Sequence, residues 1–236
     1  MFGFELDQGE HSKIISFIDD VKNIEGTHII AYKKVKLINV NDVAGFKSAI
    51  ESSSKTYGNH GYISVLDEQK NIVARTFISN IKIIKSKHNN ITFVGHVWQH
   101  PKGFQRALDK KINKEITEKN IWKTFKKDEL QGWLVCALNS NNIDKPKTNI
   151  TIQIDGNEFH NLDGFLCTLG EEIHRSGGYF GRNLAALYDC LGGNFGVESV
   201  SELIWINHQK SKKLFKSKFK EILEIFEDYN VKISLN

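Results

Sequence analysis

The feature that most restricts the fold is the order of the patterns after residue 149, where strand-like and helix-like runs alternate. The strand-like runs lie at 150–154, 203–206 and 231–235, and apolar residues recur at helical spacing at 159–173 and 214–229. Strands that are joined through helices connect by right-handed crossovers, so they lie parallel in one sheet. The order therefore predicts an α/β domain that is built on a small parallel sheet.

Within this region, residues 177–193 read GGYFGRNLAALYDCLGG, a glycine-rich loop that runs into a short helix. Asn183 fits the N-cap, because an asparagine side chain accepts a hydrogen bond from a free amide of the first turn. Gly192 and Gly193 fit the end, since a residue in the left-handed conformation commonly stops a helix. The helix is therefore short and bounded at both ends.

Helical spacing divides the side chains of this segment between two faces. The core-facing stripe consists of Leu184, Leu187, Tyr188 and Leu191, and the opposite, exposed face consists of Arg182, Ala185, Ala186 and Asp189. In the loop, Tyr179 and Phe180 add two exposed aromatic side chains to the acid Asp189, a composition that suits the binding of a partner. The alternative is a turn that only joins two core elements.

Residues 179–191 resemble the loop and inhibitory helix of the barstar family, the intracellular inhibitors of the secreted ribonuclease barnase. The resemblance continues at 203–205, 209–214 and 226–235. It covers about residues 149–236 and does not extend to residues 1–140. A three-stranded α/β fold and an inhibitory function are what this resemblance implies.

The resemblance also implies a set of toxin-binding residues. They are Tyr179, Phe180, Gly181, Arg182, Asn183, Ala186, Asp189, Gly193, Asn194 and Asp228. Asp189 is central, because a carboxylate on a rigid helix can enter the cationic pocket in which a ribonuclease binds phosphate. Asp228 matches a family acid that makes a secondary contact.

The chain departs from the family on this surface. Arg182 and Ala185 stand where barstar has further acids, and Asn194 stands where it has a tryptophan. We therefore expect the partner to be a nuclease other than barnase.

The first half of the chain predicts an α+β domain that contains an antiparallel meander. Residues 11–24 carry apolar side chains at helical spacing, and residues 27–38 alternate as a strand. Asn41 or Asp42 can cap a second helix. Three β-rich runs then follow at 60–66, 72–84 and 91–98, with turn residues between them.

After Pro101 the chain becomes charged and helix-prone through Lys127. The apolar run at 130–138 fits either a strand or a helix. A polar stretch around Pro146 predicts a linker at 141–148, which separates a domain at 1–140 from one at 149–236.

The charge changes sign at this linker. Residues 149–236 carry 9 Lys and Arg against 12 Asp and Glu, whereas residues 1–148 carry 23 against 16. A basic domain is typical of nucleic-acid binding. Because the lysines are spread over strands and helices without an arginine-rich cluster, we interpret them as solvated surface and expect no direct contact with nucleic acid.

The sequence predicts no metal, cofactor or catalytic site. His96 and His100 have i, i+4 spacing, but no glutamate lies between them, their surroundings predict a strand, and a proline follows. The glycines at 192–196 lack the lysine and the helix of a phosphate-binding loop. His60 or His96 paired with a carboxylate stays open as an acid–base pair, because such residues meet in space.

The cysteines Cys136, Cys167 and Cys190 are odd in number and form no CxxC pair, which suits reduced thiols. No signal-like segment opens the chain, and no apolar run approaches the roughly 18 residues of a membrane span. We expect a cytoplasmic protein without a membrane partner.

These features and the resemblance together predict a cytoplasmic, non-enzymatic inhibitor of a basic ribonuclease toxin, of the kind that serves as a bacterial immunity protein in toxin–antitoxin systems. The alternative is that residues 1–140 form an enzyme or a nucleic-acid-binding domain, which an attached barstar-like module regulates.

Overall fold

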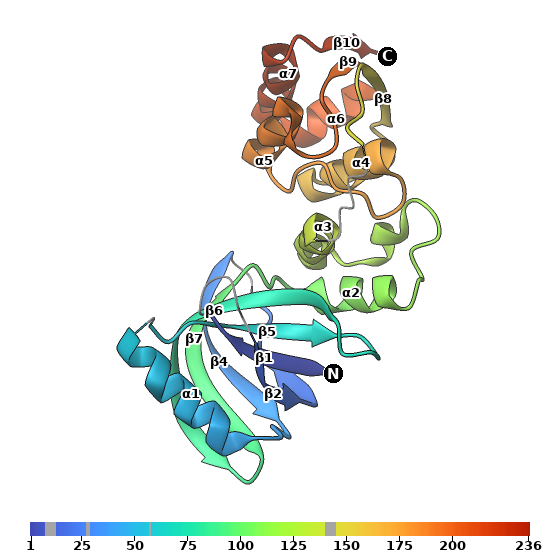
Figure 1. The fold of residues 1–236 in the computed structure, drawn as a ribbon. Helices are drawn as coiled ribbons and strands as arrows, with labels where there is room; N and C mark the ends of the chain where they lie inside the picture. The colour runs from blue at the N-terminus through green and yellow to red at the C-terminus, as the bar shows by residue number, and fades with distance from the viewer. Residues whose placement is uncertain (8–12, 27–28, 57, 140–144) are drawn as a thin grey trace. The chain divides into compact units, whose positions relative to one another are not determined.

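The computed structural model divides the chain into two compact units, Met1–Pro101 and Lys102–Asn236 (Figure 1). It describes residues 1–7, 13–26, 29–56, 58–139 and 145–236. Within these residues, no helix combines the length and the apolar character that a membrane span requires.

The first unit is a seven-stranded antiparallel sheet with the strand order β2-β1-β5-β6-β7-β4-β3. Its strands are β1 (Phe2–Leu6), β2 (Ile14–Ile18), β3 (Asp20–Lys22), β4 (Ile30–Ile38), β5 (Gly61–Leu66), β6 (Ile72–Lys87) and β7 (Asn90–Trp98). The chain passes directly from β5 to β6 to β7 through tight turns. The predicted antiparallel meander is therefore confirmed.

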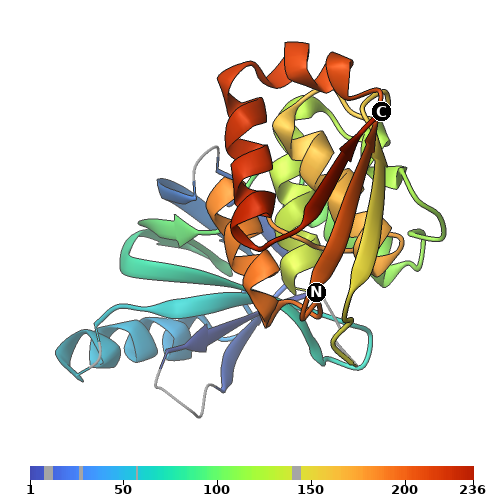
Figure 2. The same ribbon diagram turned by 90° about the horizontal axis from the view of Figure 1, so that it is seen from above.

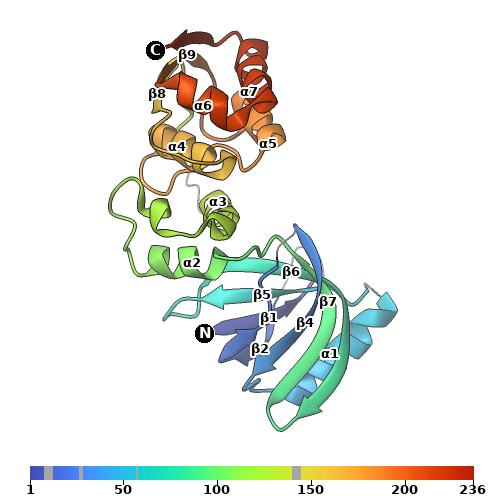
Figure 3. The same ribbon diagram turned by 180° about the vertical axis from the view of Figure 1, so that it is seen from behind.

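One face of this sheet is covered by helix α1 (Val43–Thr56), as Figures 1 and 3 show. The helix begins after Asp42, whose carboxylate accepts a hydrogen bond from Gly45 N at 2.8 Å. Alternate strand residues turn toward the helix, and the Phe4 ring lies 4.6 Å from that of Phe46. The core of the unit lies between the sheet and α1, and among the described residues of this unit no helix covers the other face.

The helix predicted at residues 11–24 is wrong. Residues 11 and 12 lie outside the described part, and the remainder contains β2 and β3, which lie at opposite edges of the sheet. The apolar spacing of Ile14, Phe17 and Ile18 also fits a strand, and β-branched residues favour that state. Strand pairing with β1 and β4 supplied the partners that decided between the two patterns.

The second unit contains a three-stranded parallel sheet in the order β10-β9-β8, whose strands lie side by side in Figure 2. The strands of this sheet are β8 (Ile150–Asp155), β9 (Val200–Ile206) and β10 (Lys232–Leu235), and the helices between these strands are α4 (Leu162–His174), α5 (Leu184–Asp189), α6 (His208–Phe215) and α7 (Ser217–Asp228). The predicted α/β fold with a small parallel sheet is confirmed.

An aromatic cluster forms the core between this sheet and its helices. The Phe165 and Trp205 rings stack at 5.2 Å, and those of Phe159 and Phe215 stack at 5.8 Å. The helix predicted at 214–229 is in fact divided into α6 and α7, because Lys216 adopts a left-handed φ of 54° between them.

Residues 102–139 belong to this second unit. They form α2 (Phe104–Ile112), two short 3-10 turns (Ile121–Thr124 and Lys127–Glu129) and α3 (Leu130–Asn139), so the undecided apolar run is a helix. Helix α3 packs on both α2 and α4. The compact units therefore divide at Pro101, whereas the linker predicted at 141–148, of which residues 141–144 lie outside the described part, falls within the second unit.

Candidate functional site around helix α5

Helix α5 begins as its sequence predicts. Asn183 is the N-cap, and its side-chain oxygen accepts a hydrogen bond from Ala186 N at 2.7 Å. The preceding Gly181 has a φ of 97°, and a Cβ on it would lie 2.8 Å from Leu187 N. Only glycine lets the loop approach the helix so closely, so the entry into α5 is held in one geometry.

The helix ends in a π-helical turn, Cys190–Asn194, in which Gly193 has a φ of 102°. The buried stripe consists of Leu187, Cys190 and Leu191, with Leu184 partly exposed. Tyr188, which the spacing predicts in the core, is 43% exposed. It lies at the edge of the stripe, where a tyrosine can pack one side of its ring and keep its hydroxyl in water.

The exposure predicted for Tyr179 and Phe180 is wrong, since these side chains are 2% and 0% exposed. The Tyr179 ring lies 5.6 Å from that of Phe195, and burial raises its pKa to about 12. The Phe180 ring lies 6.3 Å from the His174 ring, between centroids. The loop turns its aromatic residues inward, because its glycine-rich start presses the backbone against α4 and carries the two aromatic side chains into the core.

The close approach to α4 occurs at Gly170 and Gly178, where a Cβ on either glycine would collide with the backbone of the other. Beside this contact the carboxylate of Glu171 is buried. It accepts hydrogen bonds from Gly177 N at 3.1 Å, Asn120 N at 2.7 Å and Trp122 Nε1 at 3.1 Å. Burial raises its pKa in spite of these donors.

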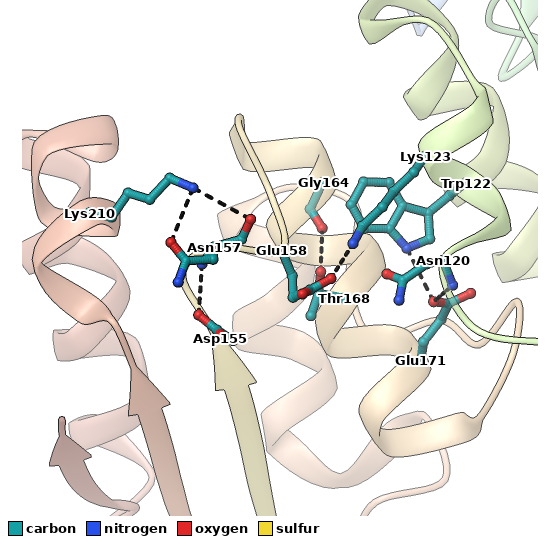
Figure 4. Close-up of polar contacts among 10 residues, drawn as sticks. All are labelled: Asn120, Trp122, Lys123, Asp155, Asn157, Glu158, Gly164, Thr168, Glu171 and Lys210. Carbon is teal, nitrogen blue, oxygen red and sulfur yellow. Dashed lines mark hydrogen bonds and ion pairs between the residues drawn. The ribbon is translucent and has the colours of Figure 1, made fainter.

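Figure 4 shows the last two of these bonds, which join α4 to the segment before α3. In the same region Lys123 pairs with Glu158, and Asn157 accepts from Lys210. Glu171 therefore ties the start of the α5 loop to residues 120–122. A single glutamate within a helical pattern gives no sequence signal for this role.

The surface that remains exposed around α5 is acidic and aromatic. We define the α5 surface as Asn183, Ala185, Tyr188, Asp189, Asp228 and Tyr229. Helix α7 packs against α5, and the Tyr188 and Tyr229 rings meet at 4.9 Å. Loss of hydration, the neighbouring Tyr188 and the two carboxylates all raise the pKa of Tyr229, which places Asp189 and Asp228 near the tyrosine pair.

The other predicted site residues lie around this surface. Arg182, Ala186 and Gly193 are partly exposed, and Gly181 is buried. The side chain of Asn194 lies outside the described part. Tyr188 and Tyr229 were missed, because an aromatic residue at helical spacing reads as core and the packing of α7 on α5 has no local signal.

The α5 surface has the chemistry to bind cations. Two carboxylates and two phenol groups supply acceptors, and the capped helix holds them on a fixed frame. Arg182 lies beside this surface, and its backbone carbonyl oxygen accepts a hydrogen bond from Gln131 Nε2 at 3.1 Å.

No group of three or more His, Cys, Asp or Glu side chains suited to a metal ion occurs in the described part of the chain. His96 lies on the sheet face opposite α1 beside Tyr32, whereas His100 is buried with its Nδ1 2.7 Å from the Thr76 hydroxyl. The two histidines therefore have separate surroundings.

Residues 149–234 match the family described as Barstar (barnase inhibitor). The match extends from β8 to Ser234 in β10 and includes the whole α5 surface, and it does not extend to residues 1–148. A comparison with curated proteins finds no match to this chain. The C-terminal part of the second unit thus carries a barstar-like domain, and the description of the matched family is that of a barnase inhibitor.

Proposed function

We propose that this protein is an immunity protein, whose barstar domain binds a basic ribonuclease toxin and blocks its active site with the α5 surface. The observation that carries the proposal is the position of Asp189. Its side chain is exposed on a capped helix beside the Tyr188–Tyr229 pair, and both Asp189 and Asp228 raise the pKa of Tyr229. The domain acts by occlusion and has no catalytic role of its own.

The chemistry follows from the substrate of the nuclease. RNA is a polyanion, so a ribonuclease presents Arg, Lys and His side chains where phosphate binds. A carboxylate in this pocket replaces the phosphate with charge-assisted hydrogen bonds. Removing one partner of such a desolvated pair costs about 2–5 kcal/mol, a range that rests in part on barnase and barstar themselves.

The rigidity of the site lowers the entropic cost of binding. The Asn183 cap and Gly181 hold the start of α5, while Glu171 and the buried Tyr179 hold the loop that precedes it. A surface that is already ordered loses less conformational freedom when it meets its partner. The buried aromatic residues thus contribute to binding indirectly, because they hold the loop before α5 in one conformation.

The composition of the surface indicates a changed target. Ala185 on the α5 surface and Arg182 beside it make this region less acidic than the family pattern, and the rings of Tyr188 and Tyr229 supply stacking area instead. We expect a nuclease whose active site offers fewer cations and a flatter apolar rim than that of barnase. The protein would act in the bacterial cytoplasm, where the RNA that such a toxin destroys is located.

The test measures the cleavage of a fluorogenic RNA oligonucleotide by small basic bacterial ribonucleases, barnase included, with and without the purified full chain. We expect stoichiometric inhibition of at least one enzyme. Asp189→Ala should weaken inhibition at least ~30-fold, which corresponds to about 2 kcal/mol. Glu221→Ala, an exposed acid on α7 outside the α5 surface, is the control and should leave inhibition unchanged.

Two results would contradict the proposal. One is an inhibited enzyme for which Asp189→Ala and Glu221→Ala behave alike, because the α5 surface would then lie outside the interface. The other is a panel in which no ribonuclease is inhibited or bound.

A further inference from the structure

The sheet face of the first unit that α1 leaves uncovered is strongly cationic. Strand alternation places seven of the twelve Lys and Arg of residues 1–101 on it. They are Lys22, Lys34, Lys36, Arg75, Lys82, Lys85 and Lys87. Residues that are scattered along the sequence thus gather on one surface, which we call the open face.

The strand register arranges the central lysines in rows. Thr92 of β7 pairs with Lys36 of β4 on one side and Lys85 of β6 on the other. One step along, Val94 pairs with Lys34 and Lys82 in the same way. Neighbouring strands are about 4.8 Å apart, so each row places two lysine backbones within about 10 Å of each other.

A hollow of about 150 Å³ lies at the first of these rows. It is lined by Lys36, Lys85, Lys87, Asn90 and Thr92. In the described part of the chain, the ion pairs of the open face are those of Lys22 with Asp20 and of Arg75 with Glu5. The lysines of β4 and of the second half of β6 therefore keep their charge available to an anionic ligand.

Aromatic rings continue the open face beyond the lysine rows. Tyr32 is 63% exposed and lies 5.1 Å from the His96 ring on β7. Trp98, the next outward residue of β7, lies 6.1 Å from Phe77. Phe77 in turn lies 5.2 Å from Tyr62, so partly exposed rings extend across β4, β7, β6 and β5.

We propose that the open face binds single-stranded RNA. Lysine rows neutralise phosphates, and a row of aromatic rings on the same sheet offers the stacking surface that unpaired bases require. A duplex hides its bases from such rings, whereas a single strand presents both phosphates to the lysines and unpaired bases to the aromatic row, so a single strand fits both halves of the surface. The choice of RNA over DNA rests on the proposed function, in which the partner nuclease acts on RNA.

This inference differs from the interpretation of the lysines as solvated surface. The charges of β4 and β6 are separated by up to about fifty residues in the sequence, and only the antiparallel register through β7 brings them together. It also gives the first unit a role that does not depend on the barstar domain. Binding to RNA would hold the inhibitor at the substrate that its target attacks.

The test titrates a fluorescently labelled oligouridylate of about twelve nucleotides with the full chain at several salt concentrations and records anisotropy. The triple variant Lys36→Ser/Lys85→Ser/Lys87→Ser should weaken binding at least ~10-fold. It should also reduce the slope of log affinity against log salt by about 2, which corresponds to about three single-strand phosphate contacts. The control Lys212→Ser/Lys213→Ser/Lys220→Ser removes the same charge from exposed positions on α6 and α7 and should change neither quantity.

The aromatic row is tested separately. Tyr32→Ala should weaken binding between about five- and hundredfold, and Tyr32→Phe should restore it, because stacking needs the ring and not the hydroxyl. Trp98 is partly exposed while Trp122, Trp133 and Trp205 are buried, so RNA should quench tryptophan fluorescence through Trp98. Trp98→Phe should abolish that quenching.

Several outcomes would overturn the proposal. One is an equal loss of affinity in the two triple lysine variants. Another is heparin that competes as well as RNA while Tyr32→Ala binds RNA with normal affinity. A third is tighter binding of oligothymidylate or duplex RNA than of the oligouridylate. Absence of binding at low salt would do the same. No nuclease is present in these measurements, so a failure here leaves the inhibitor proposal intact.

Discussion

At the scale of single residues, Asp189 and Tyr179 stand next to the same helix but belong to different environments. Asp189→Ala should change the free energy of unfolding by no more than about 0.5 kcal/mol, because the side chain is exposed. Tyr179→Ala should instead destabilise the fold by about 3–5 kcal/mol through a core cavity, and should reduce nuclease binding mainly through the unfolded fraction. Chemical denaturation and nuclease affinity measured on both variants check this difference.

The departures from the family pattern can be reversed. The double variant Arg182→Glu/Ala185→Asp restores acids at two positions of α5 and its loop, so the association rate with barnase should rise and should depend more steeply on salt. Stopped-flow mixing with barnase measures that rate. The swap Lys212→Glu/Ser217→Asp, on exposed positions of α6 and α7, gives a matched charge change, and an equal effect there would show that only net charge matters.

His100 makes the stability of the first unit depend on pH. Burial lowers its pKa to about 4 from an ordinary 6.5, so between these values the unfolded chain binds the extra proton. The contribution of His100 to the free energy of unfolding is therefore fully present above pH 6.5. It is lost as the pH falls from 6.5 toward 4, which lowers the free energy of unfolding by on the order of 3 kcal/mol. Urea unfolding across this pH range should show the loss in the wild type and in the exposed control His88→Asn, and a flatter profile in His100→Gln.

At the scale of elements, the α5 loop depends on a residue of α4. The Glu171 carboxylate accepts three hydrogen bonds through its two oxygens. In Glu171→Gln one of these oxygens becomes an NH2 group, which cannot accept a hydrogen bond from the N–H groups that face it. We expect a loss of about 1–3 kcal/mol in the free energy of unfolding and faster hydrogen exchange from Gly177 onward.

The neighbouring Glu172→Gln is the control, because Glu172 pairs with Lys119 near the surface at 2.7 Å and such pairs contribute little. If both variants exchange at the rate of the wild type, Glu171 does not hold the loop.

At the scale of the whole molecule, the barstar match at residues 149–234 lies within a larger compact unit, Lys102–Asn236. Trp122 packs on Gly164, and Gln131 Nε2 bonds Asp163 at 2.8 Å, so residues 102–139 cover α4. A fragment 102–236 should therefore unfold cooperatively, and a fragment 145–236 should be less stable by several kcal/mol or fail to fold. Thermal unfolding of the two fragments decides this, and equal stability would support the linker at 141–148 as the domain boundary.

The sequence by itself determined the features that depend on neighbouring residues. The Asn183 cap, the glycine that ends α5, the strands of the meander and the alternation that produces a parallel sheet all follow from short-range spacing and backbone preference. Residues 149–234, which match the barstar family, include the Asn183 cap, the glycine that ends α5 and the alternation of strands and helices.

Only the tertiary structure decided the features that depend on which surfaces meet. Residues 14–22 became strands because β1 and β4 offered edges, and Tyr179 turned inward because Gly170 and Gly178 allowed backbone contact. The pairing of Tyr188 with Tyr229 and the lysine rows of the open face join residues that are distant in the chain. Burial and register are properties of the packed chain, so a pattern that is compatible with two environments is resolved only when its partner is in place.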